Sequence, residues 1–229
     1  MATLDLEVRP RATRPDPVSD RGNRPPRPPE RPDGYGDDDA RPSADGRPLS
    51  NARLGMLMLL GGEIMFFGGL VIAFLQLRLE APVWPPPGQP RLPVGLTALN
   101  TLVLLGSSWT LVRALRMVRT GDRAGLVRWL GWTWGLGVLF LIIQGVEWTR
   151  LVGFGLRMSS GIYGATFYTL IGVHGAHVLG AAAWLGGVLW LARRGRFTPE
   201  RHVPLDCCAI YWHFVVALWP VLYVLVYLA

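Results

Sequence analysis

The sequence contains no lysine and almost no cysteine. All 23 basic residues among the 229 are arginine, and the only two cysteines are the adjacent Cys207 and Cys208. The missing lysine carries no functional weight. Adjacent cysteines lack the spacing of a metal site, and neighbours in a chain rarely bridge each other. We therefore expect two structural thiols within a helix, and neither a disulfide framework nor a zinc site.

Charged residues are also scarce, and they are unevenly placed. Only 17% of the residues are charged, whereas 50% are hydrophobic. Residues 51–229 hold fourteen arginines and only six acidic residues, with long runs that carry no charge. A soluble domain could not cover so apolar a surface. The positive charge lies in short loops between apolar runs, which favours a membrane protein over a nucleic-acid-binding one.

The first 50 residues have a different composition from the rest. They hold nine arginines, ten acidic residues and ten of the 19 prolines. The opening MATLDLEVRP has acidic residues and no apolar core, so we do not expect a secretory signal peptide. Such a segment cannot bury enough apolar area to offset its ordering entropy. We predict an irregular cytoplasmic tail over 1–50, and our hypothesis is that it lies along partner subunits.

Five apolar segments follow the tail. Each is long enough for the roughly 20 residues that a helix needs to cross the hydrocarbon core. They cover about residues 54–77, 93–112, 129–152, 163–192 and 207–229. Since the connections are short, neighbouring helices should be antiparallel. The predicted fold is all-α, a five-helix transmembrane bundle over 51–229. The glycines of the first segment are interpreted as helix-packing positions: Gly61, Gly62, Gly68 and Gly69.

The arginines predict an orientation for this bundle. If the N-terminus is inside, ten arginines of residues 51–229 lie on the inner side and four on the outer side. Inner loops of membrane proteins carry the excess of positive charge. The sequence therefore predicts an N-in, C-out protein of a bacterial cytoplasmic (inner) membrane.

Glu63 is the only charged residue in the first apolar segment. Lying about ten residues into a helix that rises about 1.5 Å per residue, it should sit roughly 15 Å deep, near the bilayer centre. A bare carboxylate there costs at least a few kcal/mol, so the side chain must be protonated, paired or turned toward protein. Two interpretations stay open: a proton-linked or gating acid, and a neutral acid that fixes helix packing through hydrogen bonds.

Four further polar residues lie within the predicted spans. Glu147 falls near the outer end of the third span and is interpreted as a structural interface acid. His174 and His177 share a helix face, but haem or metal ligation would need a partner histidine at equal depth. His213 in the fifth span lies at a different estimated depth, so we expect interhelical hydrogen bonds instead. Because Glu63 and His213 are close in estimated depth, their pairing is a further hypothesis.

Motifs of catalysis are missing. No glycine-rich phosphate loop follows a strand, and no nucleophile–base arrangement is visible. Inverted repeats and broken helices, which are typical of membrane transporters, are not seen either, which leaves transport as a distant alternative. We expect no catalytic, cofactor-binding or metal-binding residue in this chain.

Five sequence signatures occur in order along the predicted spans. They are GMLMLLGGEIMFFGGLVIAFLQLR at Gly55–Arg78, LNTLVLL at Leu99–Leu105, QGVEW at Gln144–Trp148, GIYGATFYTLIGVHGAHVL at Gly161–Leu179 and YWHFV at Tyr211–Val215. Together they resemble the haem-copper oxidase subunit III family, to which cytochrome c oxidase subunit III belongs, in its short five-helix form. Longer members carry two more helices at the start, which form one wall of a lipid-holding cleft.

The resemblance implies an accessory subunit of a terminal oxidase. Such a subunit has no redox centre, sits with subunits I and II that hold the haem and copper, and supports proton uptake and oxygen access. Cytochrome c is the implied electron donor to the complex, membrane lipids its surroundings, and a bound phospholipid an implied ligand. Glu63 matches the membrane acid of the family that reacts with carbodiimides; Glu147, His174, His177 and His213 match positions that look structural. A quinol oxidase or nitric oxide reductase subunit is the nearest alternative.

Overall fold

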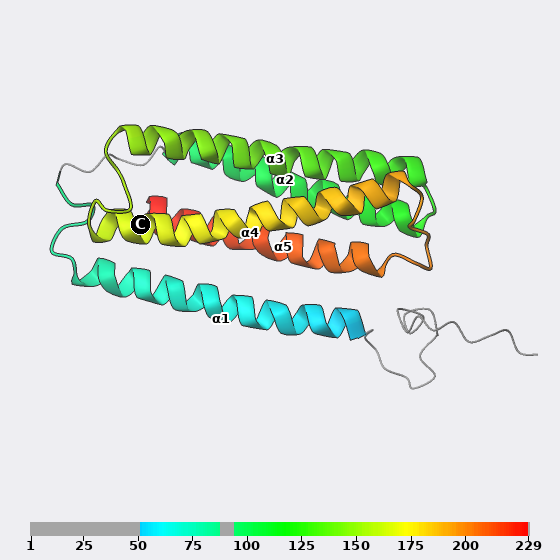
Figure 1. The fold of residues 1–229 in the computed structure, drawn as a ribbon, viewed down its shortest axis with the longest axis horizontal. Coiled ribbons are helices and arrows are strands. Elements are labelled where there is room, and N and C mark those ends of the chain that lie inside the picture. The colour runs from blue at the N-terminus through cyan, green and yellow to red at the C-terminus, as the bar shows by residue number, and fades with distance from the viewer. Residues whose placement is uncertain (1–50, 88–93, 229) are drawn as a thin grey trace, which may run out of the picture. The chain divides into compact units, whose positions relative to one another are not determined.

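The structure, a computed structural model, describes residues 51–87 and 94–228. These residues form five α-helices: α1 (Asn51–Glu80), α2 (Val94–Arg119), α3 (Arg123–Gly153), α4 (Ile162–Arg193) and α5 (Val203–Tyr223), the last followed by a π-helical turn, Val224–Leu228 (Figure 1). No strand occurs in this part of the chain. The all-α prediction with five helices is confirmed. The predicted tail, 1–50, lies outside the described residues.

Each of the five helices is long and apolar enough to cross a membrane. The spans contain 26 to 32 residues, which at 1.5 Å per residue makes them roughly 39–48 Å long. The hydrocarbon core is only about 30 Å thick, so the helix ends extend into the interfacial layers. The chain is a multi-pass membrane protein. Its orientation stays a prediction from the arginines.

The helices are longer than the apolar runs that predict them, most clearly between the second and third spans. The predicted ends at 112 and 129 become Arg119 and Arg123 in the structure. Hydropathy marks only the part of a helix that lies in hydrocarbon, whereas arginine is a good helix former whose long side chain reaches the interface. Asp122 caps α3, because its Oδ1 accepts from the Gly125 amide at 2.8 Å.

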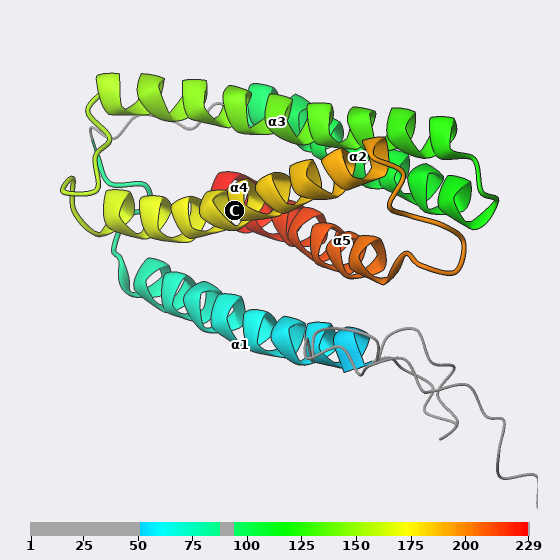
Figure 2. The same ribbon diagram turned by 45° about the vertical axis from the view of Figure 1, so that its right-hand side comes forward.

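The helices α2 to α5 form the body of the bundle. The helix α2 packs against α3 and α5, and α4 packs against α3 and α5. In both views α4 and α5 lie between α1 on one side and α2 and α3 on the other (Figures 1 and 2). The helix α1 packs on α4 and α5. Most of its surface faces away from the other helices; Met58 and Met65 are 72% and 79% exposed.

A glycine of α3 makes room for a tryptophan side chain of α5. A Cβ at Gly137 would collide with the indole of Trp212, which is fully buried at the centre of the bundle. Cys207 and Cys208 are thiols buried in α5, as expected. The glycines of α1 behave differently from the prediction. A Cβ at Gly61, Gly62, Gly68 or Gly69 would meet nothing within 4 Å among the described residues, because these positions face away from α4 and α5.

Polar contacts attach α1 to the bundle near both of its ends. Near its start Arg53 forms an ion pair with Asp206 in the first turn of α5. Near its other end Arg78 Nη1 donates to the backbone oxygen of Leu225 at 3.3 Å. The apolar side chains that α1 buries are few: Met56, Phe67 and Phe74. Glu63 lies on α1 between Arg53 and Arg78.

Candidate functional site

Glu63 of α1 faces His177 of α4. The Oε2 atom of Glu63 lies 3.2 Å from Nε2 of His177, and the two side chains are 17% and 23% exposed. The atoms are close but not aligned as a hydrogen bond, and no other donor among the described residues reaches Oε2. The pair joins the peripheral helix to the bundle at the middle of the span.

The position of one proton decides the charge state of this pair. His177 Nδ1 lies 2.7 Å from the backbone oxygen of Val173. A carbonyl oxygen only accepts, so we assign a proton to Nδ1. Nε2 then carries a proton only if the ring is an imidazolium. Glu63 and Nε2 can therefore share one further proton, either as carboxylic acid with imidazole or as carboxylate with imidazolium.

Two phenylalanines of α1 surround the same histidine. The ring of Phe67 lies 5.1 Å from that of His177, edge to face, and 6.3 Å from that of His174. Phe66 lies 6.2 Å from His177. Because Phe66 and Phe67 follow Glu63 by about one helical turn, the acid and both rings reach α4 at one level. They give the pair apolar surroundings on the side of α1.

His174 is fully buried one turn before His177. Neither ring nitrogen has a hydrogen-bond partner among the described residues. The expected interhelical hydrogen bond of His174 is therefore absent. Its ring stacks instead on Trp219 of α5, at 5.2 Å between centroids and 23° between planes. The stack replaces the hydrogen bond because α5 presents the face of an indole here.

His213 belongs to a different helix pair. Its Nδ1 lies 2.5 Å from Oγ of Ser108, which joins α5 to α2. The hypothesis that Glu63 pairs with His213 is wrong, because Glu63 contacts His177. The pairing was inferred from how deep each residue lies along its own helix. That depth does not determine which face of the helix carries the side chain.

Glu147 is buried where α2, α3 and the C-terminal turn meet. Thr97 Oγ1 donates to Oε1 at 3.0 Å, and Gln144 Nε2 donates to Oε2 at 3.0 Å. Gln144 Nε2 also lies 3.4 Å from the hydroxyl of Tyr227. Glu147 is only 1% exposed. This network supports the interpretation of Glu147 as a structural interface acid.

A row of polar side chains along α2 was not singled out from the sequence. Trp219 Nε1 donates to Thr101 Oγ1 at 2.9 Å, and Trp212 Nε1 donates to Ser107 Oγ at 3.1 Å. Asn100 Nδ2 donates to the backbone oxygen of Phe140 at 3.2 Å. Helical spacing was the available signal, since these polar residues share one face of α2 with the buried Leu104: Thr97, Asn100, Thr101, Ser107 and Thr110. Two members of this row, Thr101 and Ser107, accept hydrogen bonds from the N–H groups of buried tryptophans.

The chemistry that Glu63 and His177 can carry out together is proton exchange. Within residues 51–87 and 94–228, no group of three or more His, Cys, Asp or Glu side chains could hold a metal ion. Glu63 and His177 supply two ligands at most. The geometry places a carboxyl group and an imidazole 3.2 Å apart beside a helix that buries few side chains.

The sequence is similar to known proteins over the region that contains all five helices. A family profile described as Cytochrome c oxidase subunit III matches residues 49–229. "Cytochrome c oxidase subunit 3" of Synechocystis sp. is 35% identical over 175 residues, covering 76% of this chain and 74% of the relative. The protein of the same name in Thermostichus vulcanus is 35% identical over 176 residues, which cover 76% of this chain and 86% of that relative. The protein of the same name in Sus scrofa is 35% identical over 182 residues, which cover 76% of this chain and 68% of that relative.

Proposed function

Since the chain belongs to the cytochrome c oxidase subunit III family, we propose that it is a non-catalytic subunit that supports proton uptake, oxygen access and stability of the catalytic subunit. The complex carries out aerobic electron transport coupled to proton translocation. Its partners are subunits I and II, which hold the haem and copper, and cytochrome c is the electron donor. The N-terminus lies in the cytoplasm of a bacterial cell.

The contact between Glu63 and His177 carries the proposal of proton support. Their Nε2 and Oε2 atoms lie 3.2 Å apart, on the side of the bundle where α1 is attached. Both side chains keep some exposure on the side of the chain where α1 is attached, so a subunit packed on that side can exchange a proton with them without opening the core of α2 to α5. A carboxyl group enclosed on all sides could not exchange protons and would contribute only to helix packing.

The substitution Glu63→Gln tests this role. It keeps the shape of the side chain and removes the titratable group. We expect normal assembly and nearly normal initial turnover, followed by a faster loss of activity during continuous turnover, because proton supply to the catalytic subunit falls behind. The control is Glu80→Gln on the exposed end of α1, which should leave the time course unchanged. Immediate loss of all activity in a normally assembled complex would contradict an accessory role.

An apolar cavity supports the proposal of oxygen access. It has a volume of about 230 Å³ and lies between α1 and α4, with Leu70, Phe74, Ala165 and Leu170 among its lining residues. Molecular oxygen is apolar and concentrates in such regions of the membrane. Filling the cavity with Ala165→Phe should raise the KM for oxygen of the complex. An unchanged KM in an assembled variant would remove this part of the proposal.

Purification of the complex tests the partners and the donor. The full chain is pulled down from native membranes in mild detergent, and the accompanying polypeptides are identified by mass spectrometry. A partner with haem and copper ligands together with one bearing a dinuclear-copper motif supports a cytochrome c oxidase. A second subunit without that motif would move the donor to quinol, and a chain isolated alone would overturn the proposal.

A further inference from the structure

His213 brings a polar ring nitrogen to the surface of the bundle in the middle of the membrane. The residue lies ten positions after the start of α5 (213 − 203), which is about 15 Å along the helix and about half of the hydrocarbon core. Its side chain is half-buried. Nδ1 contacts Ser108, but Nε2 has no hydrogen-bond partner among the described residues. Unlike the nitrogens of His174, Nε2 is not enclosed by the chain.

The residues around His213 form an exposed surface on two helices. Ala217 follows His213 by one turn and is exposed on the same face of α5. On α2, Leu105 and Val112 are exposed and share a helix face with Ser108. These five residues define the α2–α5 surface. The small side chain of Ala217 lets another helix come close, as small residues do at helix contacts in membranes.

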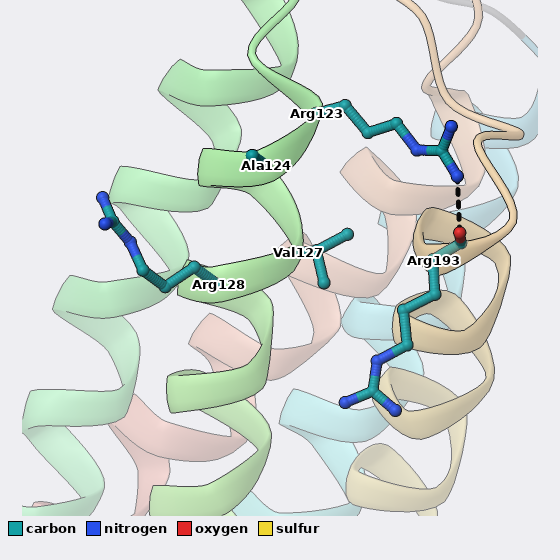
Figure 3. Close-up of a pocket in the computed structure, with 5 residues that line it drawn as sticks. All are labelled: Arg123, Ala124, Val127, Arg128 and Arg193. Carbon is teal, nitrogen blue, oxygen red and sulfur yellow. Dashed lines mark hydrogen bonds between the residues drawn. The ribbon is translucent and has the colours of Figure 1, made fainter.

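The surface between α3 and α4 has its polar groups at a different level. Figure 3 shows Arg123 and Arg128 near the start of α3 and Arg193 at the end of α4; Arg123 Nη2 donates to the backbone oxygen of Arg193 at 2.6 Å. Long arginine side chains near helix ends reach the interfacial layer. Nearer the middle of the membrane, a groove between these helices is lined only by apolar residues, Val138 among them. Lipid chains can cover that surface without leaving a polar group unpaired.

Lipid cannot satisfy His213 in the same way. An acyl chain has no hydrogen-bonding group, and the headgroups lie about 15 Å away at the membrane surface. Polar side chains within a membrane span face protein or a water-filled cavity rather than hydrocarbon. The exposed nitrogen of His213 therefore calls for a second protein segment that crosses the membrane beside α2 and α5.

The absence of charge near His213 narrows the chemistry of that segment. Neither residues 101–112 of α2 nor residues 207–228 of α5 and its C-terminal turn include Asp, Glu or Arg. A charged side chain from outside would find no opposite charge on the α2–α5 surface. A hydroxyl or amide group can donate or accept a hydrogen bond, so it fits either tautomer of the imidazole.

We propose that the α2–α5 surface binds a transmembrane helix of a partner subunit, and that a hydroxyl or amide side chain of this helix pairs with Nε2 of His213. The proposal rests on the proposed function, in which the chain is one subunit of a membrane complex. It adds the surface that makes the contact and the chemistry that the partner helix brings. Ser108 holds the imidazole in place through Nδ1, so Nε2 keeps a fixed direction.

Photo-cross-linking in native membranes tests the surface. Benzoylphenylalanine replaces Leu105 or Ala217, and the control position is Leu139 of α3. Leu139 is exposed, and it lies near the level of His213 because Gly137 adjoins Trp212. We expect adducts with a larger polypeptide from Leu105 and Ala217 and none from Leu139. Adducts from Leu139 alone, or adducts that join two copies of this chain, would overturn the proposal.

The same experiment separates this proposal from the proposed function. A chain that co-purifies with its partners but gives no adduct from Leu105 or Ala217 overturns the contact surface alone. A chain that co-purifies with no other polypeptide overturns the proposed function, and the contact surface with it.

Substitution of His213 tests the hydrogen bond. His213→Phe keeps a ring and removes both nitrogens, so retention of the chain by the complex during a detergent titration should fall about fivefold. His213→Gln supplies an amide and should restore most of the retention. Ser108→Ala is the control, because it removes only the partner of Nδ1 within this chain and should leave retention nearly unchanged. Native mass spectrometry counts the retained chain. Full retention in His213→Phe, or an equal loss in Ser108→Ala, would overturn the assigned pairing.

Discussion

Trp219 uses its ring and its N–H group for two different helices. The face of the indole stacks on His174 of α4 at 5.2 Å, and Nε1 donates to Thr101 Oγ1 of α2 at 2.9 Å. The edge of Phe140 from α3 contacts the same ring at 5.1 Å. One side chain of α5 thus contacts three other helices. The position explains why His174 is buried without a hydrogen bond.

The substitution Trp219→Phe removes the hydrogen bond from the indole N–H to Thr101 and keeps an aromatic ring at this position. Trp219→Phe should lower the unfolding free energy by about 1 kcal/mol, the usual range for a hydrogen bond between membrane helices, plus a smaller loss of contact area. Thermal inactivation of the purified complex measures the effect. Thr101→Val removes the acceptor and also the bond from Thr101 Oγ1 to the Thr97 backbone oxygen at 2.8 Å, so both single variants and the double variant are compared. The double variant should lose less stability than the sum of the two single losses; additive losses would contradict the assigned bond.

Gly137 and Gly135 provide a matched pair on α3. A Cβ at Gly137 would collide with Trp212, whereas one at Gly135 would meet nothing within 4 Å. Gly137→Ala should destabilise the bundle by about 1–3 kcal/mol through overpacking. Gly135→Ala should be neutral or stabilising by up to about 1 kcal/mol, because glycine is a poor helix former. Assembly yield and melting temperature separate the two variants; equal effects would argue against the packing of Trp212 on Gly137.

The threonine that donates to Glu147 can be tested with two substitutions. Thr97→Val removes the hydroxyl that donates to Oε1 at 3.0 Å and leaves the shape nearly unchanged. It should destabilise the complex by about 1–3 kcal/mol, since a buried acceptor loses its partner. Thr97→Ser keeps the hydroxyl and should lose much less stability. If both variants melt at the same lower temperature, packing of the methyl group would be the cause instead.

Glu63 and His177 should behave as one unit in kinetics. If both act through the contact at 3.2 Å, the double variant Glu63→Gln with His177→Gln should lose activity during turnover no faster than the more affected single variant, because residues in one contact are not additive. The number of turnovers before half of the activity is lost is the measurement. Additive effects would show that the two residues act separately.

The architecture could be predicted from the sequence because apolar length is a one-dimensional signal. Five runs of sufficient length gave five helices, and Glu63, Glu147 and the histidines fell within them as expected. Contacts between helices depend on rotation and tilt, which a run of apolar residues does not encode. For that reason His213 was paired with Glu63, and the glycines of α1 were interpreted as packing positions. The polar residues of α2 lie on one helix face in the sequence pattern, but single Thr, Ser and Asn residues are common in helices and do not indicate their partners.

The attachment of α1 has a consequence for how the protein is made. This helix leaves the ribosome first, because synthesis begins at the N-terminus, yet the helices it packs on are α4 and α5, which leave last. Arg53 and Asp206, which join α1 to α5, are 153 residues apart in the sequence. His177, the histidine that faces Glu63, is likewise 114 residues further along the chain (177 − 63), so the acid lacks this neighbour until α4 has been made. Biogenesis must therefore hold a nascent helix with an unpaired buried acid until the rest of the bundle arrives.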